Sequence, residues 1–183
     1  MDLHYNWLAA LITVGLIIGL TFIGRKIAFS IPAIAKTRDM DVDQNKQKWR
    51  NKADKYQLRV PISQRIGLGF NLAFFVLVLP FIVSLDAQPV WRILLDVFLV
   101  LMIYDFFYYL THRFLFHGQG YLRRVHAVHH QARSRVSSID SYLLHPWEIF
   151  IGIALFYVVT TSYAVAAGQP FHCLLYTSDA ADD

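Results

Sequence analysis

Histidine is concentrated in one part of this sequence. Six of the eight histidines fall within residues 112–145, where the average frequency would place about one or two. Three of these form an H-x-x-H-H motif at His126, His129 and His130. Positions i, i+3 and i+4 share one face of an α-helix, so these three imidazoles can point the same way. Neutral imidazoles suit iron, zinc, copper or nickel, and the motif therefore predicts a metal site.

His112 and His117 are five residues apart, a spacing that does not by itself bring two rings together. Five residues advance a straight α-helix by about 500°, which leaves the two side chains about 140° apart. They can reach one site only if the helix ends or bulges between them, and the sequence Gly118-Gln119-Gly120 directly afterwards makes such a break plausible. The isolated His4 and His172 are interpreted as incidental.

Two further residues have two possible interpretations each. Asp105 lies seven residues before His112 and could accept a proton from a ligating imidazole, or it could be a helix-end charge paired with an arginine. His145 could be a sixth ligand or an interfacial residue at the start of a helix. Glu148, near the start of the same helix, suits the positive end of the helix dipole.

The composition predicts an all-α membrane protein. Hydrophobic residues make up 56% of the 183 residues and charged residues only 16%, and the mean hydropathy is +0.39. A soluble domain carries about 25% charged residues. A membrane-spanning helix needs about 20 mostly apolar residues. We expect a bundle of about four spans, over residues 7–23, 66–85, 90–110 and 149–167, which together with the histidine region 105–148 form a single domain over residues 1–172.

The basic residues predict the topology. Residues 25–65 hold eleven of the seventeen Lys and Arg, residues 112–148 hold five, and residues 86–89 hold none. The positive-inside rule then places both basic segments, including the histidine region, on the cytoplasmic side of a multi-pass protein. Because these charges flank membrane helices and no recognition fold is visible, nucleic-acid binding is not expected. Residues 35–60 are interpreted as a polar linker that could form a surface helix.

The last eleven residues, 173–183, differ abruptly from what precedes them. They resemble the translation of a sequencing adapter, and a genuine short polar tail is the alternative. On the first interpretation the natural chain continues beyond His172, and the single cysteine, Cys173, does not belong to it.

In combination, the motifs resemble the fatty acid hydroxylase and sterol desaturase superfamily. The residues that carry the resemblance are D-F-F-Y-Y-L-T-H-R at 105–113, His117, R-V-H-A-V-H-H at 124–130 and H-P-W-E at 145–148. The resemblance covers about residues 105–148. The family's last histidine cluster has no counterpart here.

The resemblance implies two iron ions held by about eight or more histidines beside the membrane, although zinc can replace iron in recombinant material. By position, the ligands would be His112, His117, His126, His129, His130 and His145, with Asp105 and Glu148 as their carboxylate partners. Arg113 and Arg124 would support helices or meet an electron donor. No catalytic residue beyond the metal ligands and no organic cofactor are implied.

The implied activity is O2-dependent hydroxylation or desaturation of a lipid, such as a fatty acyl chain or a sterol. Electrons would come from a cytochrome b5-like protein or a ferredoxin/reductase system. Because the family's last histidine cluster has no counterpart here, we expect this fragment alone to be inactive. A membrane metal-binding or metal-transport protein is the main alternative, although transporters usually place their ligands within the spans. A membrane haem protein would need histidines inside two spans, and a zinc hydrolase would need H-E-x-x-H, which is absent.

Overall fold

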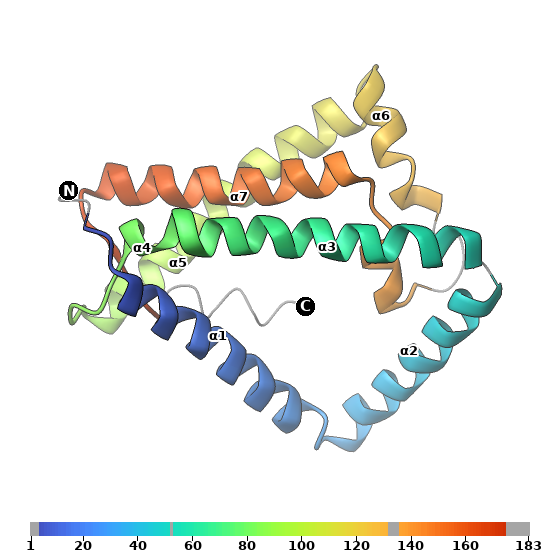
Figure 1. Cartoon of the computed structure of the whole chain (residues 1–183), viewed down its shortest axis with the longest axis horizontal. Coiled ribbons are helices and arrows are strands. Elements are labelled where there is room, and N and C mark those ends of the chain that lie inside the picture. The colour runs from blue at the N-terminus through green and yellow to red at the C-terminus, as the bar shows by residue number, and fades with distance from the viewer. Residues whose placement is uncertain (1–3, 52, 132–135, 175–183) are drawn as a thin grey trace. The chain divides into compact units, whose positions relative to one another are not determined.

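The computed structural model describes residues 4–51, 53–131 and 136–174, and these residues are almost entirely helical. They divide into two compact units. The first contains residues 4–27, 71–106 and 155–174, and the second contains residues 28–51, 53–70, 107–131 and 136–154. Three long helices, α3 (Ala53–Leu77), α5 (Val90–Leu110) and α7 (Pro146–Ala167), contribute residues to both units (Figure 1).

Four helices are long and apolar enough to cross a membrane, which confirms the predicted fold class. The candidate spans are Trp7–Ala28, Lys55–Leu77, Val90–Phe116 and Pro146–Ala167. Only 11–22% of each apolar window is buried inside the protein. Most of their apolar side chains therefore face outward, as side chains in contact with lipid do.

The second span differs from the predicted range of residues 66–85. Helix α3 begins at Ala53, continues through Pro61 and ends at Leu77. Val78 leaves the helical conformation with φ −120° and ψ −50°, and Pro80 lies in the first turn of the short helix α4 (Leu79–Ile82). Proline lacks an N–H and its ring clashes with the preceding turn, which disfavours it inside a helix. Pro61 is accommodated within α3, whereas Pro80 lies at the start of a new helix, where its missing N–H costs nothing.

The first unit packs α1 (Trp7–Ala28) with parts of α3, α5 and α7. Its core contains small residues of α1, aromatic residues and the two-residue strands β1 (Val83–Ser84) and β2 (Phe171–His172), which pair in parallel. Asp96 is buried, and its carboxylate accepts a hydrogen bond from the Tyr163 hydroxyl at 2.7 Å and lies 3.6 Å from Nε of Arg92. These contacts explain how a carboxylate is accommodated within the third span.

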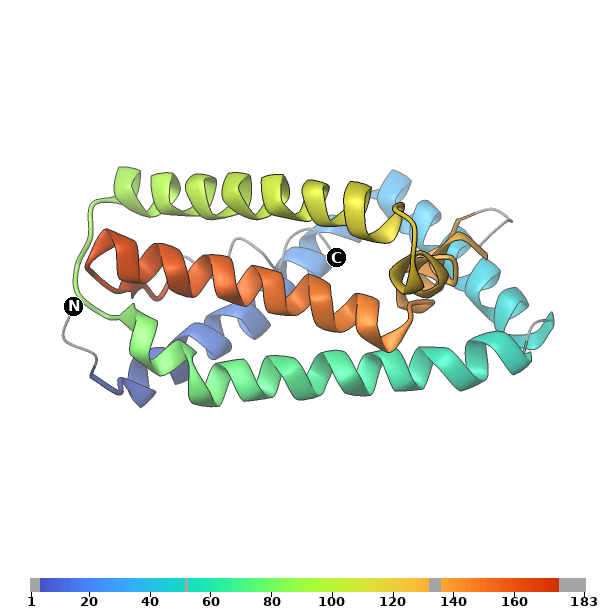
Figure 2. The ribbon, with the colours of Figure 1, turned by 90° about the horizontal axis from the view of Figure 1, so that it is seen from above.

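The second unit contains the histidine region. Its elements are α2 (Pro32–Asn51), the first part of α3, the end of α5 with the π-helical turn η1 (Thr111–Phe116), α6 (Tyr121–His126), the 3-10 turns η2 (His129–Gln131) and η3 (Ser138–Tyr142), and the start of α7. Helices α3 and α7 run side by side here (Figures 1 and 2), with the rings of Phe70 and Phe150 5.1 Å apart. The segment interpreted from sequence as a polar linker is helical throughout its described residues.

Candidate metal centre

The turn η1 brings His112 and His117 together. The backbone N–H of His117 donates to the carbonyl of His112 at 3.1 Å, which is the i→i+5 hydrogen bond of a π-helix. Residues five apart therefore lie on the same face, and the Nε2 atoms of the two rings are 3.1 Å apart. Convergence of the two rings required the helix to end or bulge between the two histidines. The structure has a π-helical turn there, which starts just before His112 and ends just before His117.

A glycine permits the chain to leave this turn. A Cβ atom at Gly118 would lie 2.1 Å from the carbonyl oxygen of Phe114, closer than any real contact. Gly120 has φ +143°, a conformation that side chains rarely adopt. Both glycines are therefore required for the tight passage from η1 to α6, which carries the next histidine.

The H-x-x-H-H motif does not lie on one α-helix, the geometry in which its spacing would place the three rings on one face. Helix α6 ends at His126, and the N–H of Val128 donates to the carbonyl of Val125 at 3.3 Å as the chain tightens into a 3-10 turn. The rings still gather. Nε2 of His130 lies 2.9 Å from Nε2 of His126, and the His129 ring centroid lies 5.8 Å from that of His126.

The His112/His117 pair and the H-x-x-H-H motif meet at His126. Its ring centroid lies 4.6 Å from that of His112 and 4.9 Å from that of His117. One nitrogen from each of these three residues lies within 4.8 Å of the others, a spacing that suits ligands of one metal ion. The Nδ1 atoms of His112 and His129 are buried without a hydrogen-bond partner among the described residues. Buried ring nitrogens that lack hydrogen-bond partners are explained better by a site for a transition metal than by a purely hydrogen-bonded core.

Glu148 fixes the orientation of His126. Its Oε1 lies 2.7 Å from Nδ1 of His126, and both side chains are buried, with 6% and 2% of their surfaces exposed. In the arrangement that satisfies both groups, Nδ1–H donates to the carboxylate. The lone pair of Nε2 then points toward the other rings, as in the carboxylate–histidine pairs that support metal ligands.

Two histidines of the cluster, His126 and His129, have lowered pKa values that favour the neutral ring. Burial, together with the neighbouring rings of His112, His130, His117 and His129, lowers the pKa of His126 to about 4. Burial and His130 also lower the pKa of His129, against a smaller opposite effect of Asp140. Because a metal binds the neutral imidazole, the rings of His126 and His129 can accept an ion near pH 7 without first losing protons.

The structure does not bring every predicted site residue to this cluster. Nδ1 of His145 accepts a hydrogen bond from the backbone N–H of Trp147 at 3.2 Å, at the start of α7. Burial and the nearby charge of Arg59 lower the pKa of His145. Asp105 lies on α5 with an exposed side chain. The roles of His145 as a ligand and of Asp105 as a carboxylate partner remain predictions.

A buried polar network beside the cluster was not predicted. The carboxylate of Asp140 in η3 contacts Nζ of Lys48, accepts a hydrogen bond from the Tyr56 hydroxyl at 2.7 Å, and accepts another from the N–H of Ser137 at 2.9 Å. All three side-chain partners, Asp140, Lys48 and Tyr56, are less than 9% exposed. The only sequence signal was a single acidic residue in the otherwise uncharged stretch 136–144.

Helix α2 also holds η3 from the side. Asp41 accepts a hydrogen bond from the N–H of Ser138 at 2.7 Å, and Asn45 accepts one from the N–H of Ile139 at 3.2 Å. Turn η3 lines a polar pocket of about 560 Å³. Its lining residues are Asp41, His129, His130, Val136, Ser137, Ser138, Asp140 and Ser141. The supposed linker therefore forms part of the scaffold beside the histidines.

The predicted tail over residues 173–183 is described only in part. The N–H of Cys173 donates to the carbonyl of Ser84 at 3.1 Å, which extends the pairing of β1 and β2 by one hydrogen bond. Residues 175–183 lie outside the described part of the chain, and the origin of the tail remains a prediction.

Comparison with known proteins bears directly on this cluster. Residues 97–179 match the family described as fatty acid hydroxylase, and this range includes the six clustered histidines and Glu148. No match to the chain is found among curated proteins or among solved structures. The match confirms the resemblance inferred from the histidine motifs, and it assigns this segment of the chain to the fatty acid hydroxylase family, a family of lipid hydroxylases and desaturases.

Proposed function

We propose that this protein is a membrane-bound, non-haem diiron oxygenase that uses O2 and electrons to hydroxylate or desaturate a lipid. The observation that carries the proposal is the convergence of His112, His117 and His126 within one segment that matches the fatty acid hydroxylase family. His129 and His130 add two further rings to the same cluster. Histidine-only sites of this kind suit iron and zinc, and the family favours iron.

Each side chain has a role that follows from its position. His112, His117, His126, His129 and His130 would hold the metal, and bound iron would supply the O2 activation that side chains cannot provide. Glu148 holds the Nδ1 proton of His126 and so keeps Nε2 available. The π-helical turn positions His112 and His117 at the end of the third candidate span, where a lipid chain can approach from the bilayer.

The substrate would reach the cluster along the end of α5. The side chains of Phe107 and Tyr109 are exposed there, whereas the ring of Tyr108 lies 5.8 Å from that of His112. The exposed rings suit contact with acyl chains. Tyr108, in contrast, packs against the first ligand, so the aromatic stretch serves packing and lipid contact at different positions.

The electron donor would meet the basic surface of α6. Arg123 and Arg124 are exposed, and with Gln119, Gly120, Tyr121 and Ala127 they line a pocket of about 720 Å³. Complementary charge steers protein partners and raises their association rate, so an acidic donor such as a cytochrome b5-like protein or a ferredoxin suits this surface. By the positive-inside rule, the histidine region and this surface would face the cytoplasm.

The number of ligands sets an expectation for residues 1–183 alone. The chain offers six clustered histidines, whereas the family resemblance implies about eight or more. We expect these residues by themselves to retain fewer than two irons and to oxidise no lipid. Formation of ¹⁸O-labelled lipid under ¹⁸O2 by the purified chain would contradict this expectation.

Deletion of the gene in its source organism tests the proposed activity. We expect the lipid profile to lose one class of hydroxylated or desaturated lipid, and the wild-type gene but not His126→Ala to restore it. The matched control is His4→Ala, which removes an isolated histidine and should restore the lipid fully. An unchanged lipid profile together with an altered cellular iron or zinc content would instead favour metal transport.

A further inference from the structure

Helix α2 must lie at a single face of the membrane. It connects the candidate spans Trp7–Ala28 and Lys55–Leu77, so both of its ends are on the same side. The helix carries five basic residues and Trp49, a residue type that is enriched at membrane–water interfaces. Because α2 belongs to the same compact unit as the histidine cluster, whatever binds α2 acts close to the metal centre.

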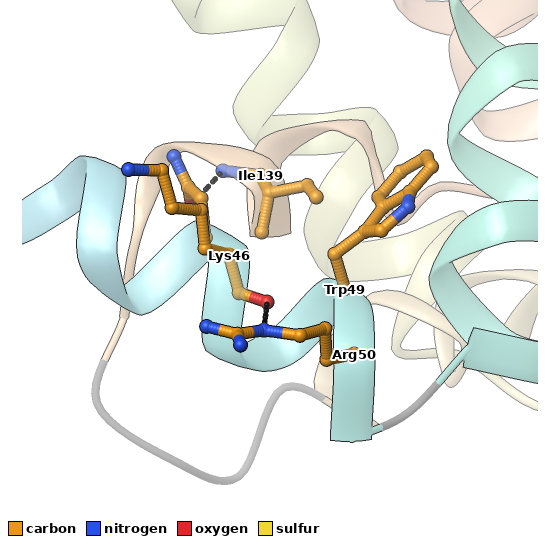
Figure 3. A pocket seen from close by; sticks show the side chains of 5 residues that line it. Lys46, Trp49, Arg50 and Ile139 are labelled. Atoms are coloured by element: carbon orange, nitrogen blue, oxygen red, sulfur yellow. Dashed lines mark hydrogen bonds between the residues drawn. The ribbon is translucent and has the colours of Figure 1, made fainter.

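A pocket of about 580 Å³ opens between α2 and η3 (Figure 3). It is lined by Asn45, Lys46, Trp49 and Arg50 of α2 and by Ile139 of η3. Two cations, one indole ring and one aliphatic side chain therefore surround the same space, and none of the lining residues that the structure describes is acidic. This size is typical of small-molecule sites.

Lys46 and Arg50, the two cations of this pocket, have N–H groups available to donate hydrogen bonds to a ligand. Nε of Arg50 donates to the carbonyl of Lys46 at 3.5 Å, as the dashed line in Figure 3 shows, while its two terminal nitrogens make no hydrogen bond with the described residues. Nζ of Lys46 lies 3.7 Å from Asp43, in an exposed pair. Such a pair contributes little and can be exchanged for a stronger anion.

We propose that this pocket binds the head group of an anionic phospholipid of the bilayer. The phosphate oxygens accept hydrogen bonds from Lys46 and Arg50, and the glycerol backbone with the first methylene groups lies against Trp49 and Ile139. A wholly polar anion would leave the indole and the isoleucine without a partner, whereas an uncharged lipid would leave the two cations without one. An anionic lipid satisfies both halves of the pocket.

Lipid binding would also secure the scaffold of the metal centre. Ile139 lines the pocket through its side chain, and its backbone N–H donates to Asn45, another lining residue. The same turn η3 also lines the pocket whose lining includes His129 and His130. A bound head group therefore contacts both α2 and η3 and stabilises their packing at the membrane surface.

Isothermal titration of the purified chain in neutral detergent tests the proposal. The probes are dihexanoylphosphatidylglycerol, dihexanoylphosphatidylcholine and inorganic phosphate, all below their aggregation limits. We expect the anionic lipid to bind most tightly and inorganic phosphate to bind weakly. The variant K46Q/R50Q should weaken binding of the anionic lipid roughly 30-fold, since each basic residue near an anionic surface contributes roughly fivefold.

The matched control is K36Q/R38Q, which removes the same charge from the same helix outside the pocket. It should change the affinity by less than about threefold. A blue shift of tryptophan fluorescence on lipid binding, present in the wild type and absent in Trp49→Phe, would locate the lipid at the pocket. Equal losses in the two double variants, or equal affinity for phosphatidylglycerol and either other probe, would overturn the proposal. Unchanged melting temperatures would show that both double variants are folded.

Discussion

The ion pair between Lys48 and Asp140 makes the sharpest prediction about stability. Lys48 is 8% and Asp140 3% exposed, and the same carboxylate also receives the Tyr56 hydroxyl at 2.7 Å. Burial raises the pKa of Asp140, but the hydrogen bonds from Lys48, Tyr56 and Ser137 outweigh it and hold that pKa below its usual value. The Asp140 carboxylate is therefore charged throughout the neutral range.

Asp140→Asn removes the counter-charge and keeps an oxygen for Tyr56. Breaking one half of a buried pair costs about 3–5 kcal/mol, because the remaining charge is still desolvated. We expect Asp140→Asn to lower the free energy of unfolding by about 3 kcal/mol. The double variant K48M/D140N should cost less than the sum of the single variants by about 2 kcal/mol, since neither charge is then buried.

Unfolding by SDS in mixed micelles measures these differences as a double-mutant cycle. The matched control is the exposed pair of Asp43 and Lys46 on the same helix, with side chains 80% and 65% exposed, for which the coupling energy should be about 0.5 kcal/mol or less. Additivity of Lys48→Met and Asp140→Asn within about 0.5 kcal/mol would refute the view that this network stabilises the scaffold.

Three further predictions concern the cluster. The metal-free protein should lose stability as the pH falls from about 6.5 to about 4, because the unfolded chain binds a proton at His126 in that range and the folded chain does not; a flat pH profile of the unfolding free energy would contradict this. Glu148→Gln should weaken metal binding about 10- to 100-fold, measured by competition with a chelator, and an unchanged affinity would show that Glu148 does not orient His126. If His145 is a ligand, His145→Ala should weaken metal binding as strongly as His117→Ala; retention of wild-type affinity would make it a helix-start residue only.

The sequence placed five histidines that the structure brings together in one site, but it did not predict how the backbone brings them together. It also placed His145 there, which the structure leaves at the start of α7. The five-residue spacing of His112 and His117 is unfavourable on an α-helix, and it becomes favourable only because η1 is π-helical. No propensity scale distinguishes a π-turn from an α-turn. The local requirement for Gly118 depends on the carbonyl of Phe114, whose position is known only once the turn is known.

The H-x-x-H-H motif is the reverse case, because its spacing suits an α-helix and the backbone does not form one. A single helix would align its three rings, yet α6 ends at His126 and the ring nitrogens of His126 and His130 lie 2.9 Å apart with the chain between them in a tighter turn. Tertiary contacts replaced the local pattern here, since the carboxylate of Glu148, 22 residues later, holds the His126 ring. Long-range pairs such as Lys48 with Asp140 had no sequence signal beyond their residue types, because periodicity reports local structure only.

The central claim is that the clustered imidazoles hold a metal ion, and X-ray absorption of the iron-loaded membrane protein tests it most directly. The account predicts bound iron whose nearest neighbours are imidazole nitrogens, with the signal and the iron content both lost in His126→Ala and both retained in His4→Ala. Iron that is absent, that is coordinated by oxygen alone, or that is retained unchanged in His126→Ala would contradict it.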